Sequence, residues 1–183
     1  MNGPISARPK RLWLIGMMGC GKSAVGKRLS PLIAWPYVDN DQMLLVREGL
    51  DLVDLAHDSP ERLHDAELAM VHTLATREPP LIAGIPASLA DHPTELEQLT
   101  TSGHLVYLRA TPQTLTARTA ATHRPFLERD PLTWTARTLT RRAPNFERYA
   151  DLVLDTDLTT PQHLARTLAQ YVTHATTNQQ EPI

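Results

Sequence analysis

A lysine and a serine stand directly after a glycine-rich segment near the start of the chain. The segment contains, in order, Gly16, Gly19, Gly21, Lys22 and Ser23. Their spacing is that of the phosphate-binding motif G-x-x-x-x-G-K-[ST], in which glycines turn backbone N–H groups toward phosphate oxygens, lysine reaches the β- and γ-phosphates, and the hydroxyl binds Mg2+. The motif predicts a site for ATP or a closely related nucleotide. A chance glycine-rich turn beside an ordinary surface lysine is the alternative.

The same segment contains the single cysteine of the chain. Cys20 has no partner for an internal disulfide, and at this place a tolerated small residue is a better interpretation than a catalytic thiol. A helix is expected to follow from Ser23, so its positive N-terminal end would add to the attraction for phosphate. The residues predicted to bind nucleotide here are Gly19, Cys20, Gly21, Lys22, Ser23 and Ala24.

Two carboxylates follow a second short apolar run. Asp39 and Asp41 come directly after Tyr37 and Val38, so both can face the phosphate site if this run is a strand. A pair of carboxylates at that place suits metal and proton chemistry. The alternative is that both aspartates cap a helix that starts near Gln42. The two roles can coexist.

Strands must alternate with helices to bring these groups together. Short apolar runs typical of buried strands occur at 12–15, 37–38, 81–83, 105–108 and 152–154, and helical patterns at 23–33, 61–76, 111–119, 131–142 and 160–172. Such alternation predicts an α/β fold, a three-layer α/β/α sandwich around a five-stranded parallel sheet. We expect one domain over 1–183, with a core at about 11–172 and flexible tails at 1–9 and 173–183.

The bulk composition favours a small soluble ligand. The chain has 183 residues and a formal net charge of −2, which gives no general attraction to nucleic acid or to an anionic membrane. No stretch resembles a signal peptide or reaches the 18 or so apolar residues that a membrane span needs. We therefore expect a cytoplasmic monomer with neither a nucleic-acid nor a membrane partner.

Several motifs occur in the order found in one family. They are the phosphate loop, Asp39-Asn40-Asp41, Arg124-Pro125-Phe126-Leu127, Arg142-Ala143-Pro144-Asn145-Phe146 and the segment 155–161. With these motifs the chain resembles the shikimate kinases over about residues 11–172. The resemblance implies a P-loop fold of the nucleoside-monophosphate-kinase type, with ATP and Mg2+ as cofactors and a hydroxyl of shikimate as the phosphate acceptor.

The resemblance also implies roles for the groups around the transferring phosphate. Lys22, Asp41 and Arg124 would be the catalytic residues, with Asp41 holding the acceptor hydroxyl as base or orienter. Arg124 would belong to a lid at about 118–130 and would contact the migrating phosphate, although a solvated loop arginine is the alternative. Ser23 and Asp39 would support Mg2+, Asp39 through a water molecule.

Further roles concern the two ligands of such a kinase. Arg118 would stack on the adenine and Pro161 would line the same pocket. Asp41, His64 and Arg142 would contact the acceptor, and Arg142 fits a carboxylate because guanidinium pairs with it through two parallel hydrogen bonds. The blander alternative is that an arginine at this helix end meets the negative end of the helix dipole.

The chain departs from the family pattern on the acceptor side. His64 replaces a carboxylate-binding arginine, and neutral imidazole lacks the two-pronged guanidinium fork. Ile85-Pro86-Ala87 replaces a glycine run after the third strand, and Ala83 replaces a hydroxyl residue near the metal. Three interpretations stay open: a divergent shikimate kinase, a kinase of another small hydroxylated metabolite, or a nucleotide-binding protein without catalysis.

Overall fold

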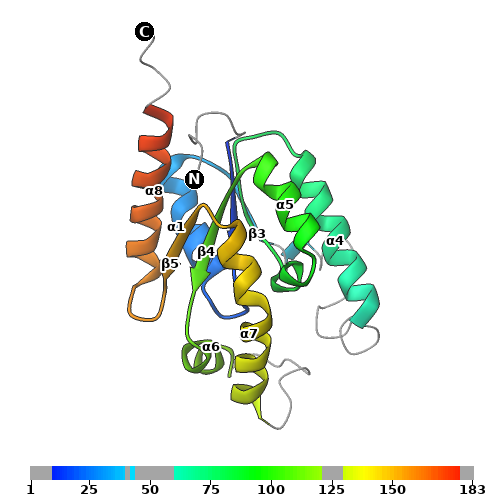
Figure 1. Ribbon diagram of the computed structural model, residues 1–183. Helices are drawn as coiled ribbons and strands as arrows, with labels where there is room; N and C mark the ends of the chain where they lie inside the picture. Colours follow the sequence, from blue (N-terminus) through cyan, green and yellow to red (C-terminus); the bar gives the residue numbers. More distant parts are fainter. Residues whose placement is uncertain (1–9, 40–41, 44–59, 121–129, 178–183) are drawn as a thin grey trace.

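The five predicted strands form one parallel sheet. The computed structural model describes residues 10–39, 42–43, 60–120 and 130–177. Its strands are β1 (Arg11–Ile15), β2 (Tyr37–Val38), β3 (Leu81–Gly84), β4 (His104–Arg109) and β5 (Leu152–Asp155), in the order β2-β3-β1-β4-β5 (Figure 1). All four pairings are parallel, which confirms the predicted sheet.

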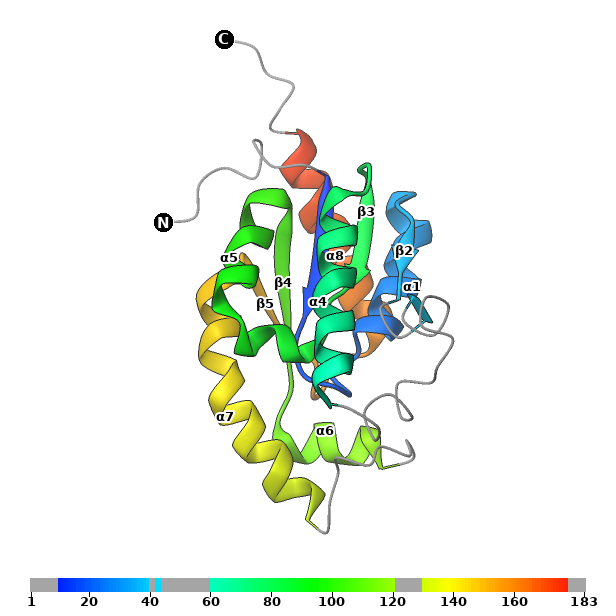
Figure 2. The same cartoon turned by 90° about the vertical axis from the view of Figure 1, so that its right-hand side faces the viewer.

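Helices cover both faces of this sheet. One layer contains α1 (Lys22–Ile33) and α8 (Pro161–Thr177), and the other contains α4 (Pro60–Thr76), α5 (Pro93–Ser102) and α7 (Pro131–Tyr149) (Figures 1 and 2). The predicted three-layer sandwich is therefore confirmed. Two shorter elements, η2 (Ala87–Asp91) and α6 (Pro112–Thr119), follow β3 and β4.

The core lies between the sheet and its two helical layers. Every residue of β1 is buried, and Trp13, Tyr107 and Phe146 are among the largest side chains fully removed from solvent. A central parallel strand is covered on both faces, so it reads as a continuous apolar run instead of alternating with polar residues. This pattern is the reason that β1 could be recognised from the sequence.

Four helical segments differ from the sequence prediction. The helix α5 and the 3₁₀ turn η2 were not predicted, and α7 continues through Pro144 to Tyr149, past its predicted end at Arg142. The fully buried Phe146 anchors the added turns of α7. The last helix runs to Thr177, past Val172, because no glycine or proline interrupts 173–177.

The strand register brings three connections to one edge of the sheet. Leu14 pairs with Gly84, and Ile15 pairs with Tyr107, so β1, β3 and β4 end at nearly the same level. The carboxyl ends of neighbouring parallel strands are where ligands collect in such sheets. The glycine-rich loop, η2 and α6 all follow strands at this edge.

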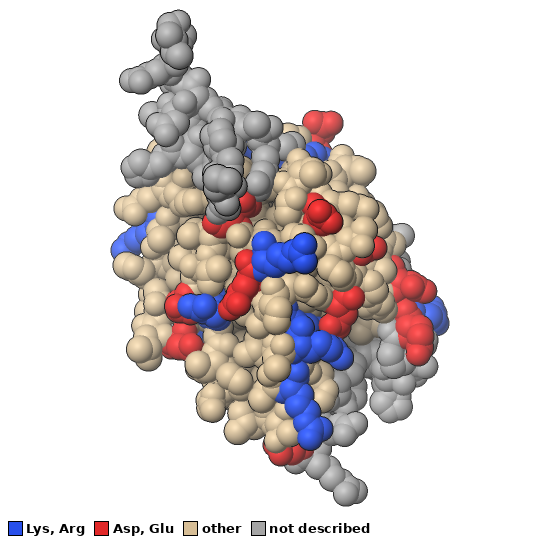
Figure 3. Space-filling view, viewed as in Figure 1, with Lys and Arg blue, Asp and Glu red and all other residues tan. Residues whose placement is uncertain are grey.

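No helix in the described ranges is long and apolar enough to cross a membrane. On the face that Figure 3 shows, basic side chains gather mainly over α7, and acidic side chains lie among them. The charges on this face are therefore mixed over short distances.

A glycine on α1 allows close packing against β2. A Cβ atom at Gly26 would lie 2.8 Å from Tyr37 Cζ and closer still to two other ring atoms. The Tyr37 hydroxyl contacts Asp39 Oδ2 at 3.4 Å, so the ring position bears on the carboxylate that follows β2. Gly26 thus lets α1 approach the strand that positions Asp39.

We predict that Gly26→Ala destabilises the protein, although the same change in an open helix would stabilise it by about 0.5–1 kcal/mol. Overpacking against the ring costs about 1–3 kcal/mol, so the free energy of unfolding falls. Urea denaturation measures the change. In a Tyr37→Val background the substitution should become neutral or stabilising; an unchanged penalty there would disprove the proposed clash.

Candidate active site

The glycine-rich loop turns sharply at three glycines. Gly16, Gly19 and Gly21 have φ angles of 137°, 81° and 104°. This region of φ is strained for residues with a side chain, so the loop path depends on glycine. At Gly19 an added Cβ would also lie 2.9 Å from Thr119 Cγ2, which shows how tightly α6 packs against the loop.

The ammonium group of Lys22 lies within the curve of this loop. Its Nζ donates hydrogen bonds to the carbonyl oxygens of Gly16 at 2.8 Å and Met17 at 3.2 Å. Cys20 is buried, with its Sγ 3.9 Å from the same Nζ. The lysine is therefore held at the place where the motif requires a cation, and Ser23 follows in the first turn of α1.

Arg118 joins the loop to the end of β5. Its Nη1 donates to Thr156 Oγ1 at 2.9 Å and to the Gly19 carbonyl at 3.4 Å, and its Nη2 donates to the Thr156 carbonyl at 2.6 Å. Pro161 begins α8 after the same β5 connection. Both residues predicted to contact the adenine thus belong to segments that border the phosphate loop; their contact with a base stays a prediction.

Asp39 lies at the carboxyl end of β2 and is nearly buried, with 9% of its side chain exposed. Besides the Tyr37 hydroxyl, Lys27 Nζ approaches its Oδ2 at 3.9 Å. The Asp39 carbonyl accepts a hydrogen bond from the Met43 N–H at 3.0 Å, as expected if a helical turn starts near Gln42. The carboxylate itself is held by neighbours on α1 and β2.

The residues at the glycine-rich loop and at the end of β2 have the chemical groups that a magnesium-bound nucleotide requires. The loop offers a glycine cradle, a cation and a hydroxyl, and Asp39 offers hard oxygen ligands, which Mg2+ prefers. Within the described ranges, no three His, Cys, Asp or Glu side chains converge into a metal site. A dedicated protein cage is not required, because Mg2+ usually keeps several waters and phosphate oxygens as ligands.

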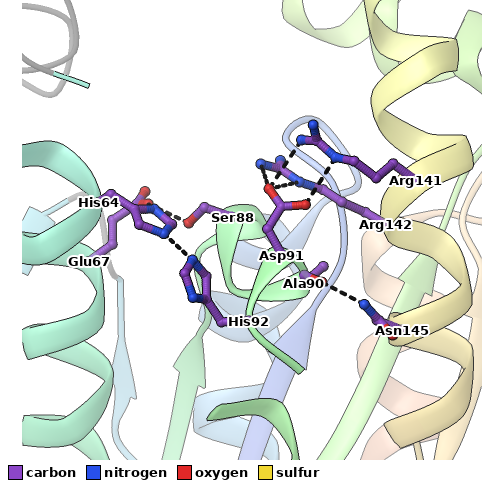
Figure 4. Close-up of polar contacts among 9 residues, drawn as sticks. All are labelled: His64, Glu67, Ser88, Ala90, Asp91, His92, Arg141, Arg142 and Asn145. Atoms are coloured by element: carbon purple, nitrogen blue, oxygen red, sulfur yellow. Dashed lines mark hydrogen bonds and ion pairs between the residues drawn. The ribbon is translucent and has the colours of Figure 1, made fainter. Parts of the chain in front are cut away.

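Beyond the carboxyl end of β3, a histidine pair links α4 to η2 and its C-terminal boundary. The Nε2 atoms of His64 and His92 face each other in a hydrogen bond, and the ring centroids lie 4.3 Å apart (Figure 4). Burial, followed by the proximity of His92, lowers the pKa of His64 below 6.5. This shift favours the neutral form of His64.

Asp91, at the end of η2, binds two arginines of α7. Arg142 donates to Asp91 Oδ2 from Nε at 3.0 Å and from Nη2 at 2.7 Å, and Arg141 Nε lies 3.1 Å from Oδ1 (Figure 4). Burial acts to raise the pKa of Asp91, but the hydrogen bonds and charge of Arg142, with the charge of Arg141, outweigh it and leave this pKa below 3.8. The aspartate is a carboxylate at neutral pH.

Two further hydrogen bonds fix η2 between the helices. Ser88 donates to the Glu67 carboxylate of α4, and Asn145 Nδ2 of α7 donates to the Ala90 carbonyl at 2.8 Å. The segment that follows Ile85-Pro86-Ala87 thus forms a short 3₁₀ turn tied on both sides. Proline fixes φ at the start of this turn, which explains why the connection no longer needs glycine.

The structure brings together some predicted site residues and not others. Lys22, Ser23 and Arg118 lie at the phosphate loop, whereas His64 and Arg142 lie on the two sides of η2. Sequence reasoning missed Asp91 and His92 as their partners. No local signal identifies them, because Asp91 is 51 residues from Arg142. The predicted Asp41, Arg124 and most of the lid lie outside the described residues.

Solved structures with the same architecture are P-loop kinases. The shikimate kinase from Acinetobacter baumannii, solved in complex with shikimate, matches with a TM-score of 0.83 at 22% identity, over 97% of this chain and 98% of that one. A gluconokinase from Sinorhizobium meliloti matches with a TM-score of 0.54 at 16% identity, over 98% and 100% of the two chains. These likenesses establish the P-loop kinase fold.

Sequence comparison gives the family. The shikimate kinase family model matches residues 18–173. Shikimate kinases of Cupriavidus pinatubonensis and Chlorobium phaeovibrioides are 32% and 30% identical, over 60% and 57% of this chain. The matched segments span 57% and 53% of those relatives, little more than half their length. The chain belongs to the shikimate kinase family, as the resemblance indicated.

We predict that the stability contributed by Asp91 depends on pH. Because its folded pKa lies below the ordinary value of 3.8, the contribution is complete above that value and disappears as the pH falls through the lowered pKa. Wild type should exceed Asp91→Asn in free energy of unfolding at pH 7, and the difference should shrink toward pH 2–3. Chemical denaturation across this range measures it. Glu97→Gln, an exposed acidic control on α5, should show a much smaller difference.

Proposed function

We propose that this protein is a small-molecule kinase that transfers the γ-phosphate of ATP to a hydroxyl group of a small metabolite. The observation that carries the proposal is the position of Lys22 within the curve of three left-handed glycines at the start of α1. Membership of the shikimate kinase family supports the same chemistry. Shikimate is the first acceptor to test.

The residues around the glycine-rich loop each contact a different part of the nucleotide. Lys22 binds the β- and γ-phosphates, loop N–H groups bind the remaining oxygens, and Arg118 and Pro161 border the base. Ser23 and Asp39 hold Mg2+, which when bound neutralises charge on the phosphate oxygens. Phosphoryl transfer needs positioning and charge stabilisation more than covalent catalysis, and these residues supply both.

Two further groups complete the proposed reaction. Asp41 orients the acceptor hydroxyl or takes its proton, and Arg124 stabilises charge on the migrating phosphate. These roles come from the family motif, and both residues lie outside the described part of the chain.

A second candidate acceptor class has a specific observation in its favour. Arg142, which the family pattern assigns to a substrate carboxylate, donates two hydrogen bonds to Asp91. A hydroxylated metabolite other than shikimate would explain why this arginine has an internal partner. A nucleotide-binding protein without catalysis would not need Lys22, Ser23, Asp39, Asp41 and Arg124 together.

We predict that Lys22→Ala lowers kcat/KM for ATP-dependent transfer by about 100-fold or more, because a preorganised charge at the transferring phosphate is lost. A coupled ADP-release assay with Mg2+ measures it. Lys10→Ala, at an exposed lysine before β1, is the matched control and should keep wild-type activity. Equal rates for the two variants would remove Lys22 from the reaction.

We predict that Asp41→Asn leaves nucleotide affinity nearly unchanged while transfer is lost, since the amide cannot accept the hydroxyl proton. Calorimetric titration with a non-hydrolysable ATP analogue measures binding, and the ADP-release assay measures transfer. Normal transfer in this variant would contradict the role of Asp41 as base or orienter.

A further inference from the structure

The polar groups beyond the carboxyl end of β3 form two networks that meet at the adjacent residues Asp91 and His92. We define the η2 cluster as His64 and Glu67 of α4, Ser88, Asp91 and His92 of η2 and its boundary, and Arg141 and Arg142 of α7 (Figure 4). Hydrogen bonds or ion pairs link each member to another member. Because β1 and β3 are paired neighbours, the cluster follows the strand next to the phosphate loop.

The charges of the arginines and carboxylates in the η2 cluster cancel. Arg141 and Arg142 contribute two positive charges, and the carboxylates of Asp91 and Glu67 contribute two negative charges. Among these four described side chains, an anionic group would therefore meet no net positive charge. It would also have to compete with the carboxylate already bound to the arginines.

Arg142 is the cation most firmly held. Only 14% of its side chain is exposed, compared with 64% for Arg141, and its Nε and Nη2 both donate to the same oxygen of Asp91. Arg–carboxylate hydrogen bonds are among the strong ones in proteins because both groups are charged. A ligand carboxylate that approached the Nε and Nη2 side of Arg142 would have to displace Asp91 from these bonds.

The same cluster offers several groups suited to alcohols. Carboxylate oxygens accept hydrogen bonds from hydroxyls, the serine hydroxyl both donates and accepts, and imidazole nitrogens donate or accept according to their tautomer. Asp91 is only partly buried, with 27% of its side chain exposed. Hydroxyl groups can add to this network without displacing an ion pair.

We propose that Asp91 is a specificity-determining residue. By binding Arg142 it makes this guanidinium less available to a ligand carboxylate, and so it selects an uncharged, polyhydroxylated acceptor over one that carries a carboxylate. The inference rests on the proposed kinase function, which it narrows. Asp91 acts through Arg142 and is therefore a positioning residue for the acceptor.

The experiment compares two acceptors that differ in charge but hardly in shape. Shikimate carries a carboxylate, and its carboxamide is nearly isosteric and neutral. The ratio of kcat/KM for the amide over the acid is measured with ATP and Mg2+ for the wild type and variants, and uncharged polyols and sugars are screened alongside. We expect the wild type to prefer the amide to the acid and to accept a neutral polyol.

Substitution of Asp91 tests its role directly. Asp91→Asn frees the guanidinium of Arg142, so the amide-to-acid ratio should fall by about tenfold or more, as expected when one charged hydrogen-bond partner is gained. Asp91→Glu keeps the negative charge and should keep the wild-type preference. Glu97→Gln removes a charge outside the cluster and should leave the ratio unchanged.

A second variant tests the inference even if Asp91→Asn does not fold. His64→Arg adds a cation to the cluster while Asp91 is kept, so the ratio should again shift toward the acid. His64→Gln removes the imidazole without adding charge and should cause no such shift. Circular dichroism identifies any variant that does not fold.

The outcomes separate the inference from the function on which it rests. The inference is overturned, while the kinase function stands, if the wild type prefers shikimate to its amide. The same holds if Asp91→Asn changes kcat/KM for the acid and for the amide by the same factor. If ATP binds but no acceptor is phosphorylated, the proposed function fails. Calorimetric titration of shikimate in the presence of a non-hydrolysable ATP analogue then decides: tighter binding to Asp91→Asn than to wild type supports the inference, and equal binding overturns it.

Discussion

The parallel pairing of β1 with β3 and β4 is the constraint on which the rest of the molecule depends. β1 is buried on both faces, and its two neighbours end beside it. The phosphate loop, η2 and α6 therefore emerge at one edge of the sheet. This arrangement brings residues distant in the sequence to one edge of the sheet, whatever the chemistry of each connection.

The two halves of the candidate site differ in how they are built. On the nucleotide side, local backbone conformation places a cation, since the glycines bend the loop around Lys22. On the acceptor side, charged groups from α4, η2 and α7 compensate one another. A site of the first kind depends on a few adjacent residues, whereas one of the second kind changes when any distant partner changes.

This difference explains what the sequence could predict. The apolar strands and the loop motif are local patterns, so the sheet and the position of Lys22 were predicted. The helix α5 was missed because Leu96 and Leu99 are its only fully buried residues, and η2 was missed because one 3₁₀ turn has no repeating pattern. The Asp91–Arg142 pair depends on tertiary contact, which spacing along the chain does not reveal.

The contact between Gly26 and Tyr37 has a consequence for how such a chain can diverge. A side chain at position 26 destabilises the fold as long as the aromatic ring at 37 is present, so the order of substitutions matters. Lineages that keep the tyrosine are under pressure to keep the glycine, and the two positions should covary among descendants. The spacing between α1 and β2 is thereby inherited as a unit, together with the placement of Asp39.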